Sequence, residues 1–242
     1  SGGGEVFFPA ATYLITDTLS LYSSQTISGT GAASVIQFSG SMAAKRSLYI
    51  PTKTNVTIHS LKFTGDVTAN VDSSTYGTAV AAVNGSGLTV RDCVIDNFPQ
   101  SGISLTDHTD FQITNNVITN VLPVINATST TPQQAIAGIN VENASDEGLI
   151  SGNTIATVGR PGAGAPALGT LGNAIRVIVQ SGTGPIAKRL RIVDNHISDI
   201  ALHGIVMYRN LGATAGGSSE GTVIANNIIS DTGLTSNISR DE

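Results

Sequence analysis

The chain has 242 residues, of which 40% are hydrophobic and only 12% are charged, so its surface must consist largely of Ser, Thr, Asn and Gly. Its net charge of −5, without a run of Lys or Arg, leaves no basic footprint, so we expect neither nucleic acid nor an anionic membrane as a partner. The sequence shows no apolar run long enough for membrane insertion, and a single all-β domain over 1–242 accounts for its length.

A ten-residue phrase occurs six times and defines the organisation of the chain. Its fourth residue is always β-branched and its ninth is always apolar, while its seventh is Leu61, then Cys93, and then Asn in the last four copies. Asn at a fixed corner can hydrogen-bond the turn backbone and its counterpart one repeat away, so we expect a structural Asn ladder. The copies occupy residues 55–64, 87–96, 110–119, 147–156, 189–198 and 221–230.

A second, shorter phrase lies between the copies and has the alternating pattern of a strand. Three short strands and three tight turns need roughly 22 residues. The shortest interval between copies, from Val90 to Ile113, is 23 residues. The sequence therefore predicts an all-β solenoid of about seven coils with three short strands per coil, in which longer intervals hold surface loops. The second phrase reads AVAA at 79–82, GISL at 102–105, GINV at 138–141, AIRV at 174–177 and GIVM at 204–207.

These features resemble the right-handed parallel β-helix superfamily of pectate lyase-like proteins, which includes polysaccharide lyases, alginate epimerases, glycoside hydrolases and phage tailspike depolymerases. The resemblance is carried by the opening GGGEVFFPAATYLI at 2–15 and by the I-x-N-N-x-I phrase at 113–118 and 224–229. It implies a right-handed parallel β-helix. In such proteins an Asp/Gly-rich strand and a capping helix precede the glycine run, so the resemblance also implies truncation at the N-terminus. Residues 230–242 show no evident cap, which leaves an early C-terminal end open as well.

We expect the functional site on the face formed by the second phrase, because binding residues gather on loops held by a rigid scaffold and the longest loops flank this face. A parallel-sheet floor between two loop walls suits an extended polymer, and the resemblance implies the same face as the usual substrate site. The loops occupy 65–78, 121–136 and 157–172 before the phrase, and 180–188 and 209–220 after it.

Alternation of inward and outward residues assigns three outward columns on this face. We predict catalytic roles for His203, Tyr208 and Arg176. The alternatives are structural roles for His203 and Tyr208, and a solvated ion pair of Arg176 with Glu142. The columns run Ser104, Asn140, Arg176, Val206; Thr106, Glu142, Ile178, Tyr208; and Ser101, Ala137, Asn173, His203. The residues predicted to bind substrate are Asn140, Glu142, Asn173 and Arg209.

The outward residues favour elimination over hydrolysis. Hydrolysis of a glycosidic bond normally needs two carboxyl groups, and this face offers only Glu142. Elimination or epimerisation of a uronic acid needs a cation or amide that neutralises the substrate carboxylate, and a group that transfers a proton. Arg176 with the two Asn side chains suits the first task, and His203 or Tyr208 suits the second.

Two phrases of related enzymes are missing. A likeness to β-helix polygalacturonases would require acidic residues on these coils, followed by a Gly-His-Gly phrase. Only His203-Gly204 of this set is present. The Tyr-Gly-x-Asp-x-His phrase of alginate epimerases is replaced at 101–106 by SGISLT. The first departure argues against a polygalacturonase. Glu142 falls where the next-coil acid of the epimerases lies, so epimerisation stays an open alternative.

The sequence thus predicts a lyase-like enzyme that acts on an extracellular, uronic-acid-containing glycan. The alternatives are a non-catalytic glycan-binding or receptor-binding β-helix, such as part of a phage tail or adhesin, and a glycoside hydrolase whose acids lie elsewhere. The predicted partner is a polysaccharide, and a trimer is expected only if the protein is tailspike-like. No cofactor or metal is predicted; the weaker alternative is calcium, for which Glu142 with Asn140 and Asn143 offers a thin set of oxygen ligands. We expect the protein to be secreted or on a virion or cell surface.

Overall fold

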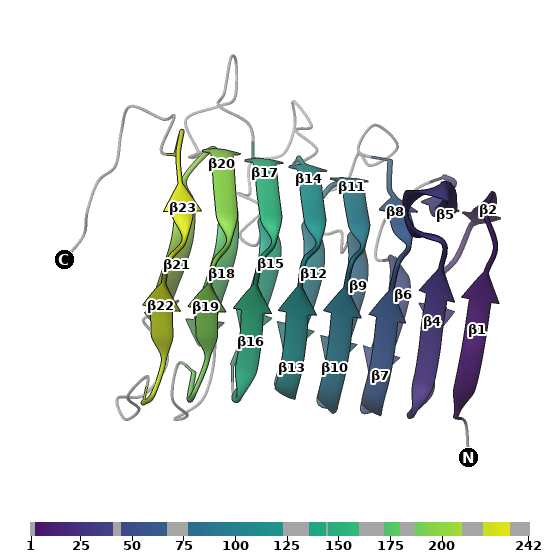
Figure 1. Cartoon of the computed structure of the whole chain (residues 1–242), viewed down its shortest axis with the longest axis horizontal. Helices are drawn as coiled ribbons and strands as arrows, with labels where there is room; N and C mark the ends of the chain where they lie inside the picture. Colours follow the sequence, from purple (N-terminus) through teal and green to yellow (C-terminus); the bar gives the residue numbers. More distant parts are fainter. Residues whose placement is uncertain are drawn as a thin grey trace.

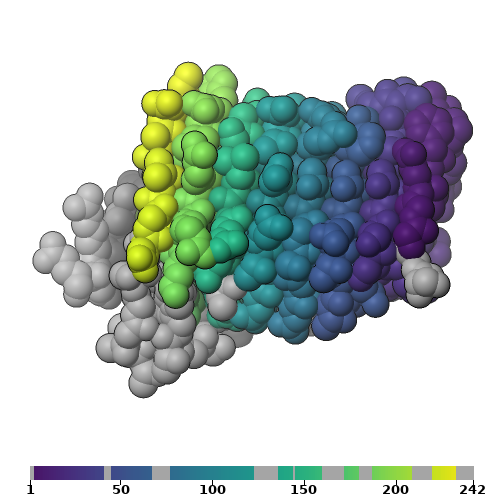
Figure 2. Space-filling model, turned by 60° about the horizontal axis from the view of Figure 1, so that its bottom comes forward, coloured from purple at the N-terminus to yellow at the C-terminus, as the bar shows by residue number. Residues whose placement is uncertain are grey.

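The structure, a computed structural model, describes residues 3–40, 45–66, 77–122, 136–143, 145–159, 172–179, 187–209 and 220–232. These residues form a right-handed parallel β-helix in which three sheets enclose one core (Figure 1). The coils follow one another in sequence order along the long axis of the molecule (Figure 2). The described residues contain one short 3-10 turn, η1 (Gly31–Ala33), and no helix that could cross a membrane.

Each coil contributes one strand to each sheet. Sheet A stacks β1 (Gly4–Phe8), β4 (Gln25–Gly29), β7 (Thr54–His59), β10 (Ser86–Arg91), β13 (Thr109–Thr114), β16 (Gly148–Ser151), β19 (Arg191–Val193) and β22 (Val223–Ala225). Sheet B stacks β2 (Ala11–Ile15), β5 (Ser34–Phe38), β8 (Lys62–Thr64), β11 (Val94–Phe98), β14 (Val117–Val121), β17 (Thr154–Val158), β20 (His196–Ile200) and β23 (Ile228–Ile229). Sheet C stacks β3 (Leu19–Ser20), β6 (Arg46–Pro51), β9 (Thr78–Val83), β12 (Ser101–Thr106), β15 (Ala137–Glu142), β18 (Asn173–Val179) and β21 (His203–Arg209).

The strand order confirms the predicted coil. Three strands make each of seven complete coils, and β22 with β23 adds two strands of an eighth. From β7 on, the ten-residue phrase supplies the strands of sheets A and B, and from β9 on, the second phrase supplies those of sheet C. The opening segment forms the first coil, as expected from its sequence.

Two positions of the ten-residue phrase lie at corners that need a left-handed backbone. The residue at the first position has a φ between 50° and 70° in all six copies, and the residue at the sixth position has a φ between 55° and 66°. Asn, Asp and Gly adopt this conformation most readily, which explains why they dominate both positions. The sixth-position residues are Ser60, Asp92, Asn115, Gly152, Asp194 and Asn226.

The seventh position forms the predicted Asn ladder. The Oδ1 atom of Asn153 accepts hydrogen bonds from the backbone N and from Nδ2 of Asn116, both at 3.0 Å. Its Nδ2 atom donates to Ile113 O at 2.9 Å and to Oδ1 of Asn195 at 2.9 Å. Asn195 bonds to Asn227 in the same way, and the ladder begins where Cys93 N donates to Asn116. Buried amides therefore tie each of these coils to the next.

Small residues open the second phrase because the chain turns a corner there. A Cβ atom on Gly102 would lie 2.8 Å from Ile118 Cγ2 in sheet B, so this residue faces the core. The following Ile103 is fully buried as well. Two consecutive residues thus face inward, and the residue before them lies on the outer side of the coil. This corner sets the outer position that Asn173 and His203 occupy in later coils.

Replacement of Asn153 by Leu should lower the free energy of unfolding by about 2–4 kcal/mol, because it leaves buried donors of Asn116 and the carbonyl of Ile113 unpaired. Leu fits the corner, since Leu61 occupies it in an earlier coil. The matched control is Asn227→Leu in the half-buried last coil, where we expect less than half the loss. Equal losses in urea unfolding would contradict a special role for the buried ladder.

Candidate functional site

Sheet C brings the three predicted columns into register. Asn140 pairs with Ser104 on one side and with Arg176 on the other, and Arg176 pairs with Val206. Glu142 pairs with Ile178, which pairs with Tyr208. Neighbouring strands lie ~4.8 Å apart, so side chains of these columns can contact one another across strands. The alternation rule therefore placed the outward residues correctly.

Arg176 bonds directly to three side chains of the two neighbouring strands. Its Nη1 atom donates to Asn140 Oδ1 at 2.8 Å and to Glu142 Oε1 at 3.0 Å. Its Nε atom donates to the phenol oxygen of Tyr208 at 3.0 Å, and its guanidinium carbon lies 5.5 Å from the centre of that ring. Asn140 in turn donates to Ser104 Oγ at 3.2 Å. We call Ser104, Asn140, Glu142, Arg176 and Tyr208 the arginine cluster.

Burial distinguishes the members of this cluster. The ion pair of Arg176 with Glu142 is present, but the Arg176 side chain is 2% exposed and that of Glu142 is 16% exposed, so the pair is not solvated as that alternative supposed. Tyr208 is 38% exposed and is the member that a ligand reaches most easily. Three of the five guanidinium donors are used within the protein. The main effect of Arg176 is therefore to hold the ring and the phenol oxygen of Tyr208 in place.

Ser145 was not predicted from the sequence, and it stabilises the turn that follows β15. Ser145 is buried, and its hydroxyl donates to the carbonyl of Glu142 at 2.9 Å. The Ser145 hydroxyl oxygen also accepts a hydrogen bond from the backbone N of His108 at 3.2 Å. Ser145 thus links the end of β15 to the neighbouring coil. Serine gives little sequence signal in a chain so rich in it, whereas the register of Ser104 with Asn140 was predicted by the columns and is confirmed.

Asn173 and His203 form a separate pair at the start of β18 and β21. The Asn173 Oδ1 atom lies 3.1 Å from His203 Nδ1. An amide oxygen only accepts, so Nδ1 carries the proton and Nε2 keeps its lone pair. Partial burial lowers the pKa of His203 below 6.5, which favours the neutral ring at neutral pH. The pair therefore presents a proton acceptor at Nε2.

The predicted site residues thus fall into two groups. Five residues of extended chain separate His203 from Tyr208, or about 16 Å along β21. One sugar unit cannot contact both, whereas an extended polymer can. The side chain of Arg209 and most of the predicted wall loops lie outside the described residues.

The described outer residues of sheet C carry few acidic groups. Glu142 is the only carboxylate among the outward residues of β12, β15, β18 and β21, and it is already paired with Arg176. The part of the chain that the structure describes contains no group of three His, Cys, Asp or Glu side chains able to hold a metal ion. The arrangement can therefore transfer a proton and bind polar groups, but it lacks the second carboxylate of a hydrolase in these strands.

His108 lies in the corner between β12 and β13, where its backbone N donates to Ser145 Oγ. Its side chain is buried, and Nδ1 lies 3.3 Å from Thr109 O. Its Nε2 atom finds no hydrogen-bond partner within the described residues. Burial lowers the pKa of His108 below 6.5. The residue is thus a neutral core histidine.

Comparison with known proteins gives a family and a set of similar folds. The family model described as a right handed beta helix region matches residues 21–175, and no curated protein matches the chain. The catalytic domain of a GH87 α-1,3-glucanase in complex with nigerose is 16% identical with a TM-score of 0.57, over 93% of this chain and 40% of that one. An exopolygalacturonase from Thermotoga maritima is 15% identical with a TM-score of 0.57, over 93% and 59%. ORF18 of Geobacillus virus E2 is 14% identical with a TM-score of 0.52, over 95% and 54%.

At these identities the likeness to solved structures shows the fold alone. The chain spans between 40% and 59% of the length of these three proteins. Two of them are described as glycan-cleaving enzymes and one is a viral protein. The same fold thus serves proteins of different kinds.

Replacement of Arg176 by Met should destabilise the protein by about 3–5 kcal/mol, because it leaves Glu142 partly buried without its cation. The double variant Arg176→Met with Glu142→Gln should recover part of this loss, since no unpaired charge remains. Urea unfolding of both variants and of Glu142→Gln alone gives the coupling energy. A coupling near zero would show that the ion pair does not stabilise the site.

The free energy of unfolding should fall as the pH falls below 6.5, because the unfolded chain gains a proton on His108 that the folded protein resists. Stability is fully present above this pH, and one such group contributes a slope of up to about 1.4 kcal/mol per pH unit. We expect His108→Gln to reduce the slope between pH 7 and pH 5. The exposed His196→Asn serves as the control and should keep the slope of the unaltered protein. Identical slopes in both variants would exclude His108 as the source.

Proposed function

The chain belongs to the family of right-handed β-helix regions, and we propose that it binds a polysaccharide along the outer face of sheet C and cleaves it by elimination. The observation that carries the proposal is the buried Arg176, which donates to the exposed phenol of Tyr208 at 3.0 Å. A fixed cation beside a reactive oxygen is typical of sites that transfer protons. The substrate class is an extracellular glycan that contains uronic acid, which places the protein outside the cell or on a virion or cell surface.

Tyr208 is the proton-transfer group of the proposed reaction. Its oxygen accepts from Arg176 Nε, so negative charge that develops on this oxygen is stabilised by the guanidinium. With Tyr208 as the phenolate, its oxygen removes the proton beside the uronate carboxylate and becomes the phenol, a carbon–carbon double bond forms, and the bond to the leaving sugar oxygen breaks. That oxygen takes a proton, which the phenol returns.

The remaining predicted residues have supporting roles in this proposal. Asn140 and Glu142 hold the guanidinium from the opposite side, so they position Tyr208 through Arg176. Arg209 follows Tyr208 directly in β21, and its predicted role in binding the substrate remains part of the proposal. Asn173 and His203 bind a sugar unit farther along the polymer, where the His203 Nε2 atom accepts from a hydroxyl.

The chemistry of the face favours elimination over hydrolysis. Hydrolysis needs a second carboxyl group, and among the described outward residues of β12 to β21 in sheet C only Glu142 carries one. A role in glycan or receptor binding without turnover is the second candidate. This binding role is favoured because three donors of Arg176 are already used within the protein. A guanidinium bonded in this way stabilises a binding surface whether or not a reaction takes place there.

Tyr208→Phe tests the proposal because it removes the phenol oxygen and keeps the ring. We expect cleavage to fall by about 100-fold or more, while binding of the same polymer changes little. Mass spectrometry of soluble products from acidic and neutral polysaccharides measures the cleavage, and products one water lighter than hydrolytic ones identify elimination. The matched control is Tyr49→Phe, which lies in the outward column of Arg176 at the far end of sheet C.

Full activity of Tyr208→Phe would contradict the assignment of Tyr208. Products of full mass would contradict elimination and favour a hydrolase. Retention of a polymer without any product, in the unaltered protein as well as in the variant, would favour the binding role.

A further inference from the structure

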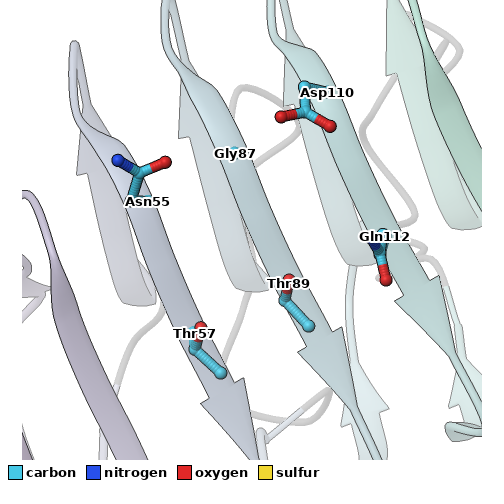
Figure 3. A pocket seen from close by; sticks show the side chains of 6 residues that line it. All are labelled: Asn55, Thr57, Gly87, Thr89, Asp110 and Gln112. Carbon is cyan, nitrogen blue, oxygen red and sulfur yellow. The ribbon is translucent and has the colours of Figure 1, made fainter.

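The outer face of sheet A carries a groove that lies apart from the site on sheet C. Two adjoining hollows of about 260 and 440 Å³ share Asp110 and Gln112 and together cross β7, β10, β13, β16 and the start of β19. Small-ligand sites commonly have volumes of ~300–1,000 Å³. We call these two hollows the sheet A groove. The residues that line its first part are Asn55, Thr57, Gly87, Thr89, Asp110 and Gln112 (Figure 3).

The groove is bounded by two rows of side chains that the coil repeats in register. Asn55, Gly87 and Asp110 are the first residues of their phrases, and all three have a positive φ. Thr57, Thr89 and Gln112 occupy the third position and pair directly across the strands. Asn55 and Asp110 therefore stand on strands about 10 Å apart, with Gly87 between them. Figure 3 shows this gap over Gly87 and the parallel row below it.

Gly87 keeps this part of the groove open. A Cβ atom at this position would lie 2.6 Å from Asn55 Oδ1, so any side chain here would displace that of Asn55. A longer residue would fill the gap between Asn55 and Asp110. The backbone around the gap is held by parallel strands on both sides, so a ligand would not have to order it.

The polar groups of the groove are available to a ligand. Within the described residues, no hydrogen bond to the protein involves the side chains of Asn55, Thr57, Thr89 or Gln112, and none of these is charged. Amide and hydroxyl groups both donate and accept, as sugar hydroxyls do, and a carboxylate accepts from two hydroxyls at once. Two carboxylates, of Asp110 and Glu147, and two guanidinium groups, of Arg189 and Arg191, line the groove, so it carries no net charge that would favour an acidic glycan. The next acid along the groove, Glu147, is paired with Arg189.

We infer that the sheet A groove binds a linear, neutral oligosaccharide, with one sugar unit over each coil. The strand spacing of ~4.8 Å is comparable to the rise of one unit along such a chain. Asn55 and Asp110 bind hydroxyls from one side, and Thr57, Thr89 and Gln112 bind them from the floor. This site goes beyond the proposed cleavage on sheet C, which concerns an acidic glycan on a different sheet.

The test uses nuclear magnetic resonance of the 242-residue protein with two probes, an α-1,3-linked glucose hexamer and a galacturonate hexamer. We expect the glucose hexamer to shift the side-chain amide signals of Asn55 and Gln112, and the galacturonate hexamer to leave them unchanged. Thr89→Tyr fills the floor and Asp110→Asn removes the carboxylate, and each should weaken binding at least tenfold. The matched control is Thr114→Tyr, on the same strand as Gln112 but outside both hollows.

Unchanged Asn55 and Gln112 signals with the glucose hexamer, or full affinity in both groove variants, would overturn the inference. A shift with the galacturonate hexamer alone would overturn the preference for a neutral ligand. Tyr208→Phe should leave binding in the groove unchanged, so failure of the groove and failure of the proposed cleavage site are read from different signals.

Discussion

The whole structure depends on one constraint, which is that every coil must repeat the backbone path of the coil before it. Parallel strands can then exchange hydrogen bonds between coils, and buried Ile, Val and Leu side chains stack in a continuous column. Two left-handed corners and one buried amide enforce this path in the later coils. The Asn ladder supplies hydrogen-bond partners to backbone groups of a turn that water cannot reach. One amide side chain in each of these coils therefore fixes the position of the next coil.

Because the inward positions are committed to this repeat, chemical variety is confined to the outward columns and the loops. A side chain on sheet C has neighbours at fixed spacing in the coils before and after it. Arg176 shows the result, since it contacts Asn140 and Glu142 on one neighbouring strand and Tyr208 on the other. Glu142 and Tyr208 belong to the same column, two strands apart, and the guanidinium lies between them.

Much of this could be predicted from the sequence because the repeat is so regular. The strand order, the Asn ladder and the three outward columns of sheet C all follow from the spacing of the phrases. The burial of Arg176 could not be predicted, because it depends on how three side chains fit around one guanidinium. The sheet A groove was missed for another reason. Its residues belong to the phrase that defines the coil, so Asn55, Thr89 and Gln112 were read only as parts of the repeat.

The cost of burying a guanidinium is the strongest argument that the arginine cluster has a function. A β-helix does not need a cation on its outer face, since Ser104 and Val206 occupy the same column in neighbouring coils. Removing a charge from water is expensive, and a well-packed apolar side chain usually serves stability equally well. Three hydrogen bonds of Arg176 offset this cost, and one of them is to the phenol oxygen of Tyr208, a residue that remains exposed to solvent. Residues that depart from the usual rule against buried charges are expected at functional sites. Here the buried guanidinium of Arg176 bonds to Tyr208, the one exposed member of the cluster.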